Sequence, residues 1–347
     1  MKKLAFVFVF FLILFNACDT PTPTPQPAAI QKGIFILNEG LWQMNNSTLS
    51  FFNTDNKVAI EDLFLQQNNR GLGDTGSDLQ KYGNKLYVVV NVSERLEILD
   101  LQTGKSLKAI SFSGCQPRRI CFDQEYAYLS CFNGEIYKID TVSLSIVDRA
   151  QAGANPDGIA VANGKLYVAN SGGLNYPNYG NTLSVFDLKN FSLLREISVV
   201  TNPVRLIAHN SGKLFLISAG DYSNINSSLQ CINTQTDEVI DLQIPASGFA
   251  IDEQKLYFYN YNYNTQQSIF QVLDIPTLTI VNENFITDGT SIETPYCIAI
   301  DPITHDVYIA DVFNYTITGI VSCFDSFGRK KFDFEVGINP TAIVFRK

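Results

Sequence analysis

The chain has 347 residues, of which 46% are hydrophobic and 17% charged, so it can bury a large core and is too apolar for an intrinsically disordered protein. Its net charge is -9 at pH 7, and no basic run exceeds three residues. This charge pattern argues against nucleic-acid binding, which depends on Lys and Arg side chains that neutralise phosphates.

The first residues have the pattern of a secretion signal. Lys2 and Lys3 precede an apolar run, Leu4–Phe15, which is too short to span a bilayer as a helix but suits the core of a signal peptide. Ala17 and Cys18 follow, and this order resembles a bacterial lipoprotein signal, in which a small residue precedes a lipid-modified cysteine. We expect a signal peptide over residues 1–17 and lipidation at Cys18; the alternative is a secreted protein without a lipid.

Residues 18–32 are rich in Pro and Thr and predict an extended, semi-rigid tether, because such a sequence supports neither a helix nor a strand ladder. A tether of this kind would hold a globular domain, residues 33–347, away from a membrane. No other stretch of the chain has the length and hydropathy of a membrane-spanning helix.

A phrase of the type "NPDGIAVANGKLYVAN" recurs along the chain, and its proline marks the period. The spacings between these prolines are 39, 47, 92 and 45 residues. The spacing of 92 is about two periods, and Ser247 takes the place of the proline in the intervening copy. An earlier, more divergent copy begins at Thr75. The marker residues are Pro117, Pro156, Pro203, Pro295 and Pro340.

Each repeat contains four short alternating strands separated by Gly, Asn and Asp turns, and no stretch shows a convincing helical period. This pattern predicts blades of a β-propeller, with strands a to d running from the central axis outward. The first recognisable strand, in "GIFILNEG", corresponds to strand b, whereas the last, in "INPTAIVF", corresponds to strand a. We therefore predict an all-β, seven-bladed propeller of antiparallel blades, closed by the C-terminal strand joining the N-terminal strands in one blade.

Two further repeated features favour structural roles. One aromatic residue per blade lies within strand b, which indicates packing between blades, at Phe35, Tyr87, Tyr128, Tyr167, Phe215, Tyr257 and Tyr308. One Asp or Asn ends each strand c, which indicates side chains that bond turn backbone rather than a metal, at Asn53, Asp100, Asp140, Asp187, Asn233, Asp274 and Asp325. The segment "GLGDTG" has the spacing of a dinucleotide fingerprint, but the strand pattern that follows it argues against nucleotide binding.

Six cysteines follow Cys18, with no CxxC pair and no zinc spacing. Most of them lie in apolar runs, which favours buried free thiols. A disulfide between Cys115 and Cys131 is the alternative in an oxidising compartment. No metal site and no cofactor are expected.

In a propeller the b–c and d–a loops share one face, and here the b–c loops are long while the a–b turns are minimal. These loops combine aromatic side chains with Asn, Arg and Asp, which suits a sizeable polar organic ligand; loop filler without a binding role is the alternative. The predicted ligand-binding residues are Asn38, Trp42, Arg118, Arg119, Asp157, Asn170, Tyr176, Tyr179, Arg205, Asp221, Tyr222, Tyr261, Tyr263, Tyr296, Asp311 and Phe313.

The pattern of catalytic residue types favours a protein that is not an enzyme. His209 and His305 fall in or beside a–b turns, on the face opposite the long loops, and neither has a nucleophile pattern beside it. A hydrolase or lyase would need paired carboxylates at the channel mouth, for which Asp157, Asp221 and Asp311 are the candidates. We keep that as an alternative, together with a scaffold or adhesion propeller that binds a protein or a glycan.

The phrases "LNEG", "LGDTGSDLQKYGNKLYVVVN" and "NPDGIAVANGKLYVANSGG" resemble a family of propeller lipoproteins of Bacteroidetes type, related to the YncE and surface-layer propellers. Some members resemble cobalamin-capturing lipoproteins that work with outer-membrane transporters. The resemblance implies a monomer, lipid-anchored in the cell envelope at the outer membrane, that binds a small organic ligand, a corrinoid first, and cooperates with a TonB-dependent transporter.

Overall fold

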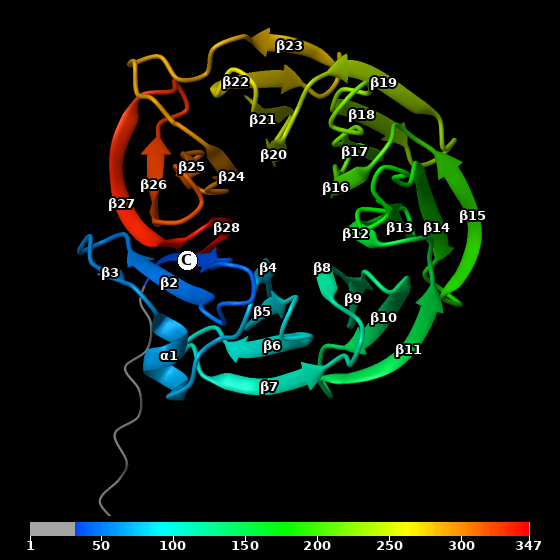
Figure 1. Ribbon diagram of the computed structural model, residues 1–347, viewed down its shortest axis with the longest axis horizontal. Coiled ribbons are helices and arrows are strands. Elements are labelled where there is room, and N and C mark those ends of the chain that lie inside the picture. The colour runs from blue at the N-terminus through cyan, green and yellow to red at the C-terminus, as the bar shows by residue number, and fades with distance from the viewer. Residues whose placement is uncertain (1–31, 347) are drawn as a thin grey trace, which may run out of the picture.

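The computed structural model describes residues 32–346. The predicted signal peptide, the lipidation at Cys18 and nearly all of the predicted tether lie outside these residues. The described strands form seven four-stranded antiparallel sheets arranged as blades around a central channel (Figure 1). The prediction of an all-β, seven-bladed propeller is confirmed.

The four strands of each blade run in chain order from the channel outward, apart from the blade that contains both ends of the chain. Blade one contains β28 (Pro340–Arg346), β1 (Gly33–Asn38), β2 (Thr48–Asn53) and β3 (Ala59–Ile60). Blade two contains β4 (Gly76–Tyr82), β5 (Lys85–Val90), β6 (Arg95–Asp100) and β7 (Ser106–Ser111). Blade three contains β8 (Pro117–Asp123), β9 (Tyr126–Cys131), β10 (Glu135–Asp140) and β11 (Ser145–Gln151). Blade four contains β12 (Pro156–Ala162), β13 (Lys165–Asn170), β14 (Thr182–Asp187) and β15 (Ser192–Ser198).

The remaining three blades continue the same order. Blade five contains β16 (Pro203–Ala208), β17 (Lys213–Ser218), β18 (Ser228–Asn233) and β19 (Val239–Ile244). Blade six contains β20 (Gly248–Asp252), β21 (Lys255–Asn262), β22 (Gln267–Asp274) and β23 (Thr279–Asn282). Blade seven contains β24 (Pro295–Ile300), β25 (Val307–Asp311), β26 (Thr318–Phe324) and β27 (Lys330–Ile338).

The ring closes in blade one, where β28 pairs antiparallel with β1 from Gly33↔Arg346 to Asn38↔Pro340. Figure 1 shows the C-terminal end of the chain beside the N-terminal strands. The C-terminal strand thus completes a sheet that the N-terminal strands begin, as the repeat phase predicts. This pairing joins the two ends of the described chain in one sheet and so closes the ring.

The strand b aromatics pack between neighbouring blades. Tyr87 of blade two contacts Phe122 of blade three with ring centroids 4.8 Å apart, and Tyr308 of blade seven contacts Phe345 of blade one at 5.2 Å. All seven strand b aromatics are buried. Burying each large ring contributes roughly 1.5–3 kcal/mol, so these residues hold adjacent blades together.

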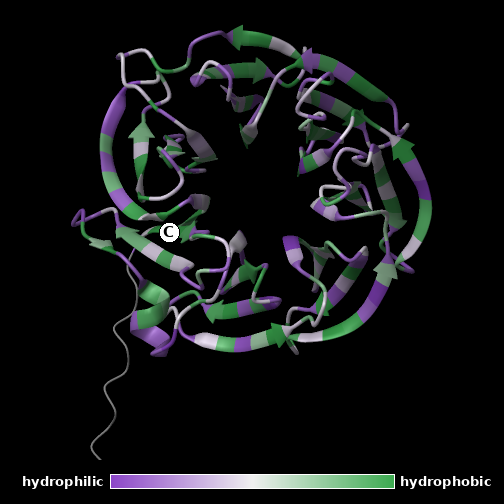
Figure 2. Ribbon diagram, in the orientation of Figure 1, coloured by the Kyte–Doolittle hydropathy of each residue, from purple (hydrophilic) through white to green (hydrophobic). Residues whose placement is uncertain are grey.

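The outer strands have one solvent-facing side. Figure 2 shows hydrophilic and hydrophobic residues alternating along β27, whose sequence is KKFDFEVGI. Phe334 and Val336 of this strand are buried, and Asp333 and Glu335 between and beside them are exposed. This alternation is the pattern of a strand with one buried and one solvated side.

The Asp and Asn residues that end each strand c stabilise the c–d turns, as predicted. Asp100 accepts hydrogen bonds from the backbone N–H of Gln102 at 3.0 Å and Thr103 at 2.8 Å, and Asn53 accepts from Asp55 at 2.9 Å. The other five make the same kind of bond to their own turns. Within residues 32–346 no group of three His, Cys, Asp or Glu side chains is arranged to hold a metal ion.

The sequence showed no helical period, but the structure contains one short helix among the described residues. A six-residue helix, α1 (Leu63–Asn68), follows the short strand β3. Asp62 caps it by accepting a hydrogen bond from the Leu65 N–H, and Leu63 and Phe64 are buried against blades one and two. Six residues are too few to show a helical period, so the sequence pattern could not reveal it.

The helix α1 precedes the Gly71–Gly76 segment, and a strand, β4, follows that segment. This order confirms that the segment lacks the strand–turn–helix context of a dinucleotide site. Among residues 32–346, no helix combines the length and apolar character that a membrane crossing requires.

Candidate functional site at the channel mouth

A β-bulge at the start of the innermost strand shapes the channel mouth. In blade three, Pro117 pairs with Cys131 but Ile120 pairs with Leu129, so β8 contains one more residue than β9 between these pairs. Comparable register shifts occur in blades one, two, four, five and seven. Blade six, where Ser247 replaces the repeated proline, pairs β20 with β21 without a shift. A bulge re-aims the side chains next to it, which brings these residues toward the channel.

The bulged strands surround a cavity of about 320 Å³ at the channel mouth, which we call the mouth cavity. The residue directly after the repeated proline lines it in five blades: Arg118, Asp157, Val204, Tyr296 and Thr341. Ser77 takes the corresponding place in blade two, and no residue of blade six contributes. The remaining lining residues are Glu39, Arg119, Phe132, Ser171, Gly173, Tyr179, Asn202, Arg205 and Tyr222.

A buried carboxylate links two arginines in this cavity. Arg118 Nη2 lies 2.9 Å from Asp157 Oδ2, and Arg119 Nε lies 3.5 Å from Asp157 Oδ1. Burial alone would raise the pKa of Asp157, but Arg118 and Arg119 outweigh that effect and hold it below its ordinary value. Asp157 is therefore a carboxylate at neutral pH. The guanidinium of Arg118 also lies over the Phe132 ring, 4.5 Å from its centroid.

A third arginine in the cavity has no such partner. Arg205 is half-buried, and its guanidinium makes no ion pair or hydrogen bond with any residue between 32 and 346, although its charge helps to lower the pKa of Asp157. A guanidinium carries five N–H donors in a planar fork that matches carboxylate and phosphate groups. These donors remain available for a ligand in the cavity.

A tyrosine and a glutamate form the opposite wall. Tyr296 donates a hydrogen bond of 2.8 Å from its hydroxyl to Glu39 Oε2. Burial of the phenol, and the neighbouring Glu39 carboxylate, raise the pKa of Tyr296 well above its ordinary value, so it stays a neutral donor. The cavity thus combines three arginines, two carboxylates and neutral hydroxyl groups.

Tyrosines gather on the same face over blades four to seven; we call them the tyrosine rim. In the first part, Tyr179 contacts Tyr176 with ring centroids 6.1 Å apart and Tyr222 at 5.9 Å, edge to face. Tyr179 and Tyr222 also line the mouth cavity. The rim therefore begins at the cavity and extends outward over the loops of blades four and five.

The second part of the rim lies over blades six and seven. Tyr296 contacts Tyr315 with centroids 5.8 Å apart, Tyr315 Oη lies 3.3 Å from Tyr263 Oη, and Tyr263 contacts Tyr261 at 4.8 Å. Tyr261 and Phe313 line a second cavity of about 910 Å³ between blades six and seven. Five of the predicted aromatic residues thus line one or the other of two cavities on this face, whereas Tyr176 and Tyr263 belong to the rim without lining either.

Several predicted ligand-binding residues lie on this face without lining either cavity. Asn38 donates to Ser50 Oγ at 2.8 Å and Asn170 to Ser184 Oγ at 2.9 Å, so both order the end of strand b. Asp311 accepts from three backbone N–H groups, including that of Thr294 at 2.9 Å. These three side chains therefore have a structural role at the end of strand b, and their part in ligand binding stays a prediction.

Asp221 and Trp42 also lie outside the two cavities. Asp221 accepts hydrogen bonds from the backbone of its own loop, at Ser223, Asn224 and Ile225. Trp42 is 70% exposed. A contribution of either side chain to binding stays a prediction.

The sequence prediction omitted several cavity residues, of which Glu39, Phe132 and Thr341 are examples. Thr341 directly follows a repeated proline, in the same position as Arg118 and Asp157, so the repeat itself contained the signal. Glu39 and Phe132 each follow the last residue of a strand b. Neither residue belongs to the repeated phrase, so the repeat contains no signal for them.

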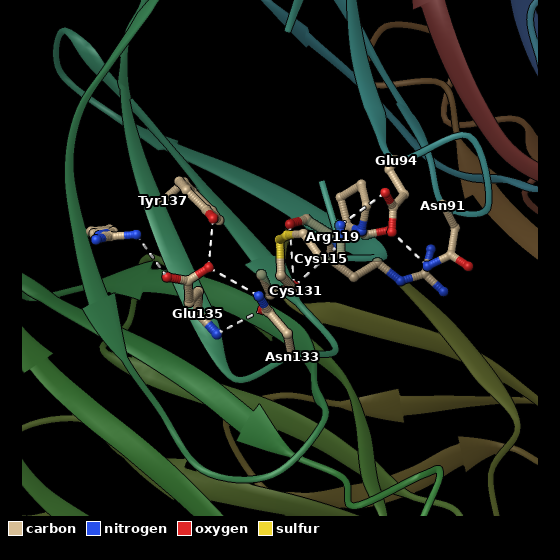
Figure 3. Close-up of a disulfide and its surroundings, with 12 residues drawn as sticks. Asn91, Glu94, Cys115, Arg119, Cys131, Asn133, Glu135 and Tyr137 are labelled. Carbon is tan, nitrogen blue, oxygen red and sulfur yellow. Dashed lines mark hydrogen bonds and ion pairs between the residues drawn. A yellow bond between two sulfur atoms is a disulfide. The ribbon is translucent and has the colours of Figure 1, made fainter. Parts of the chain in front are cut away.

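A disulfide joins Cys115 to Cys131 beside the mouth cavity, with Cα atoms 5.4 Å apart (Figure 3). The preference for free thiols is wrong for this pair and correct for Cys121, Cys231, Cys297 and Cys323. Spacing along the chain could not decide the pairing, since it depends on the register of β8 against β9. The bond connects the loop before β8 to the end of β9, next to Arg118 and Phe132, so it anchors one wall of the cavity.

Both histidines lie at turns on the opposite face, as predicted. His305 Nδ1 lies 2.9 Å from Asp252 Oδ2, beside a third cavity of about 270 Å³. Hydrogen bonding to Asp252 raises the pKa of His305 above its ordinary value. His209 lies between Ser211 Oγ at 2.7 Å and the Glu253 carbonyl oxygen at 2.8 Å.

The sequence profile of a family described as "Domain of unknown function (DUF5074)" matches residues 32–345. No functionally curated protein matches this sequence. Among solved structures, a quinonprotein alcohol dehydrogenase-like protein from Bacteroides thetaiotaomicron is 15% identical, with a TM-score of 0.68 over 91% of this chain and 79% of that one. A functionally unknown protein from Desulfotomaculum acetoxidans is 13% identical, with a TM-score of 0.67 over 91% of this chain and 99% of that one. At these identities the likeness shows the propeller fold alone.

Proposed function

This chain belongs to the DUF5074 family, and we propose that it is a non-catalytic protein of the cell envelope that captures a small polar organic ligand at the mouth cavity. The observation that supports this most directly is Arg205, a half-buried cation in a cavity without a partner among the described residues. The donors of this guanidinium are open to the cavity, so a ligand with matching acceptors can bind them. The ligand would therefore carry a carboxylate, a phosphate or a comparable acceptor.

The size and setting of the cavity favour a ligand that extends beyond it. A volume of about 320 Å³ lies at the lower end of small-molecule sites. The tyrosine rim outside it offers flat apolar area with hydroxyl groups. A polar group in the cavity and a broad ring system against the rim would use both features.

A corrinoid is the first candidate for such a ligand. Cobalamin combines a wide macrocycle with amide side chains and a phosphate, and the resemblance to YncE-like, cobalamin-capturing lipoproteins points the same way. In this proposal Arg205 binds the phosphate and the tyrosine rim supports the macrocycle. A protein-binding or glycan-binding scaffold is the alternative.

The ion pairs and hydrogen bonds of the three candidate carboxylates, Asp157, Asp221 and Asp311, support a binding role over that of a hydrolase or lyase. Asp157 is held ionised by Arg118 and Arg119, so it is a poor proton donor. Asp221 Oδ1 accepts hydrogen bonds from backbone N–H groups of its own loop, and Asp311 accepts from the backbone N–H groups of Glu293, Thr294 and Phe313. Of the three, Asp157 alone lines the mouth cavity among the described residues, and it is paired with arginines.

The position of the chain start supports capture away from an anchor. Gly33 pairs with Asn53 and Arg346, at the end of blade one opposite the long loops. If Cys18 is lipidated, the tether would leave from the far face and the mouth cavity would point away from the membrane. The partner that we propose for such a tethered monomer is a TonB-dependent transporter in the outer membrane, which the domain would reach by turning on its tether.

Isothermal titration of the purified protein with cyanocobalamin and with cobinamide, which lacks the phosphate, tests the proposal. We expect saturable binding of cobalamin, and Arg205→Gln should weaken it by roughly tenfold to a hundredfold, as expected for the loss of a charged hydrogen bond. The same variant should change cobinamide binding little.

The matched control is Arg149→Gln, because Arg149 lies on an outer strand with 71% of its side chain exposed and should leave binding unchanged. Absence of heat with both corrinoids would reject the corrinoid as ligand. Equal affinity of Arg205→Gln and wild type for cobalamin would reject Arg205 as the phosphate-binding group.

A further inference from the structure

The second cavity, between blades six and seven, is larger than the mouth cavity, at about 910 Å³ against 320 Å³. It lies on the same face, next to the outer end of the tyrosine rim. The hairpin end of β21 and β22, the loop before β24 and the b–c loop of blade seven form it. Its lining residues are Tyr261, Gln266, Gln267, Ser268, Ile269, Ser291, Ile292, Glu293, Thr294, Phe313, Asn314 and Ile317.

The chemistry of this lining differs from that of the mouth cavity. Among the described residues that line it, Glu293 alone is charged, and none is an arginine or a lysine. The side chains of Gln266, Gln267 and Ser291 make no hydrogen bond with any residue between 32 and 346. Amide and hydroxyl groups both donate and accept, so they complement ligands whose polar groups do the same.

Two aromatic rings border the cavity and their loops are held in place. Phe313 has φ of 53° and Tyr315 has φ of 67°, a region that bulky residues rarely adopt and that costs roughly 1 kcal/mol or more each. Thr294 donates to the Phe313 carbonyl oxygen at 2.7 Å, and Tyr315 Oη lies 3.3 Å from Tyr263 Oη. These two contacts hold the loop that carries Phe313 against its neighbours, which lowers the entropy lost on binding.

We propose that this cavity binds a neutral carbohydrate. The rings of Tyr261 and Phe313 offer faces for the C–H surfaces of sugar rings, and the free amides and the Ser291 hydroxyl offer partners for sugar hydroxyls. An anionic ligand would meet Glu293 without a compensating cation. A purely apolar ligand would leave Gln266 and Gln267 unpaired on desolvation.

The test is titration of the purified protein with neutral oligosaccharides, namely hexasaccharides of a β-glucan and an α-mannan, followed by calorimetry. We expect saturable binding of at least one, weakened about tenfold in Phe313→Ala through loss of ring contact. Gln267→Ala should weaken binding several-fold without affecting folding, since its side chain bonds nothing within the described chain. Thermal unfolding of each variant reports whether it is folded.

The control is Phe327→Ala, because Phe327 lies at a c–d turn on the opposite face and is 70% exposed; its oligosaccharide affinity should equal wild type. Arg205→Gln should also keep wild-type affinity for the oligosaccharide, since Arg205 lies in the mouth cavity. The carbohydrate proposal is therefore tested independently of the corrinoid proposal. Absence of saturable binding by both oligosaccharides, wild-type affinity in Phe313→Ala, or loss of sugar binding in Arg205→Gln would overturn the proposal.

Discussion

The two faces of the propeller are made from the same strands but differ in what connects them. On the mouth face, the b–c loop of blade four runs from Ser171 to Asn181 and reaches the cavity through Ser171, Gly173 and Tyr179. On the opposite face, the a–b turn of the same blade consists of Asn163 and Gly164. Short turns keep the hairpins in register, whereas long loops cost little extra closure entropy and are free to carry binding groups. Side-chain chemistry that varies between blades therefore accumulates on one face.

Blade six differs from the other blades at the mouth. Its innermost strand, β20, lacks both the proline and the bulge, and it contributes nothing to the mouth cavity. Its b–c hairpin instead extends to Asn262↔Gln267 and forms part of the second cavity. One altered position in the repeat thus accompanies a separate cavity with different chemistry.

Among substitutions that test the difference between the two faces, Asp157→Asn at the mouth cavity should have the largest effect on stability. Removing the carboxylate leaves two largely buried arginines unpaired, which should lower the free energy of unfolding by about 3 kcal/mol. Urea unfolding measures this. An anionic ligand would replace the missing charge, so it should stabilise the variant more than it stabilises wild type.

The control for Asp157→Asn is Asp333→Asn. That substitution removes an exposed pair with Lys330, whose side chain is 36% exposed, and should cost less than about 1 kcal/mol. Similar losses in both variants would contradict the special role of the mouth carboxylate.

Loss of the Cys115–Cys131 disulfide should have the next largest effect on stability. Replacing Cys115 and Cys131 by alanine opens a cross-link across 16 residues, which should cost about 3 kcal/mol at most. Because the bond anchors the wall that carries Arg118 and Phe132, affinity at the mouth cavity should fall several-fold while oligosaccharide binding between blades six and seven stays unchanged. Thermal unfolding measures the stability, and ligand titration measures the affinity, of oxidised and reduced wild type. Reoxidation should restore both the stability and the mouth affinity. Unchanged mouth affinity after reduction would count against the anchoring role.

The smallest expected effect on stability comes from the titration of His305 on the opposite face. Its folded-state pKa is raised above the ordinary value of 6.5 by Asp252, so the stabilisation by the charged imidazole is fully present below pH 6.5. It is lost as the pH rises through the folded-state pKa. NMR titration should return the pKa of His305 toward 6.5 in Asp252→Asn, and binding at the mouth cavity should not change over this pH range. A mouth affinity that follows His305 would mean that the two faces are coupled.

The sequence by itself determined the parts of this protein that repeat locally. Strand alternation, turn residues and the spacing of Pro117, Pro156 and their counterparts depend on the chain within one blade, so they predict seven blades and their closure. The same locality predicts the buried strand b aromatics and the c–d turn bonds. It also places the long loops on one face.

Only the tertiary structure decided which of those loop residues meet. The mouth cavity combines side chains as distant in sequence as Glu39 and Tyr296, and the bulges that aim them arise from pairing between strands rather than from residue preference. The Cys115–Cys131 bond, the division of the tyrosines between two cavities and the unpaired state of Arg205 have the same origin. Each depends on distances across blades, which a single sequence does not encode at any one position.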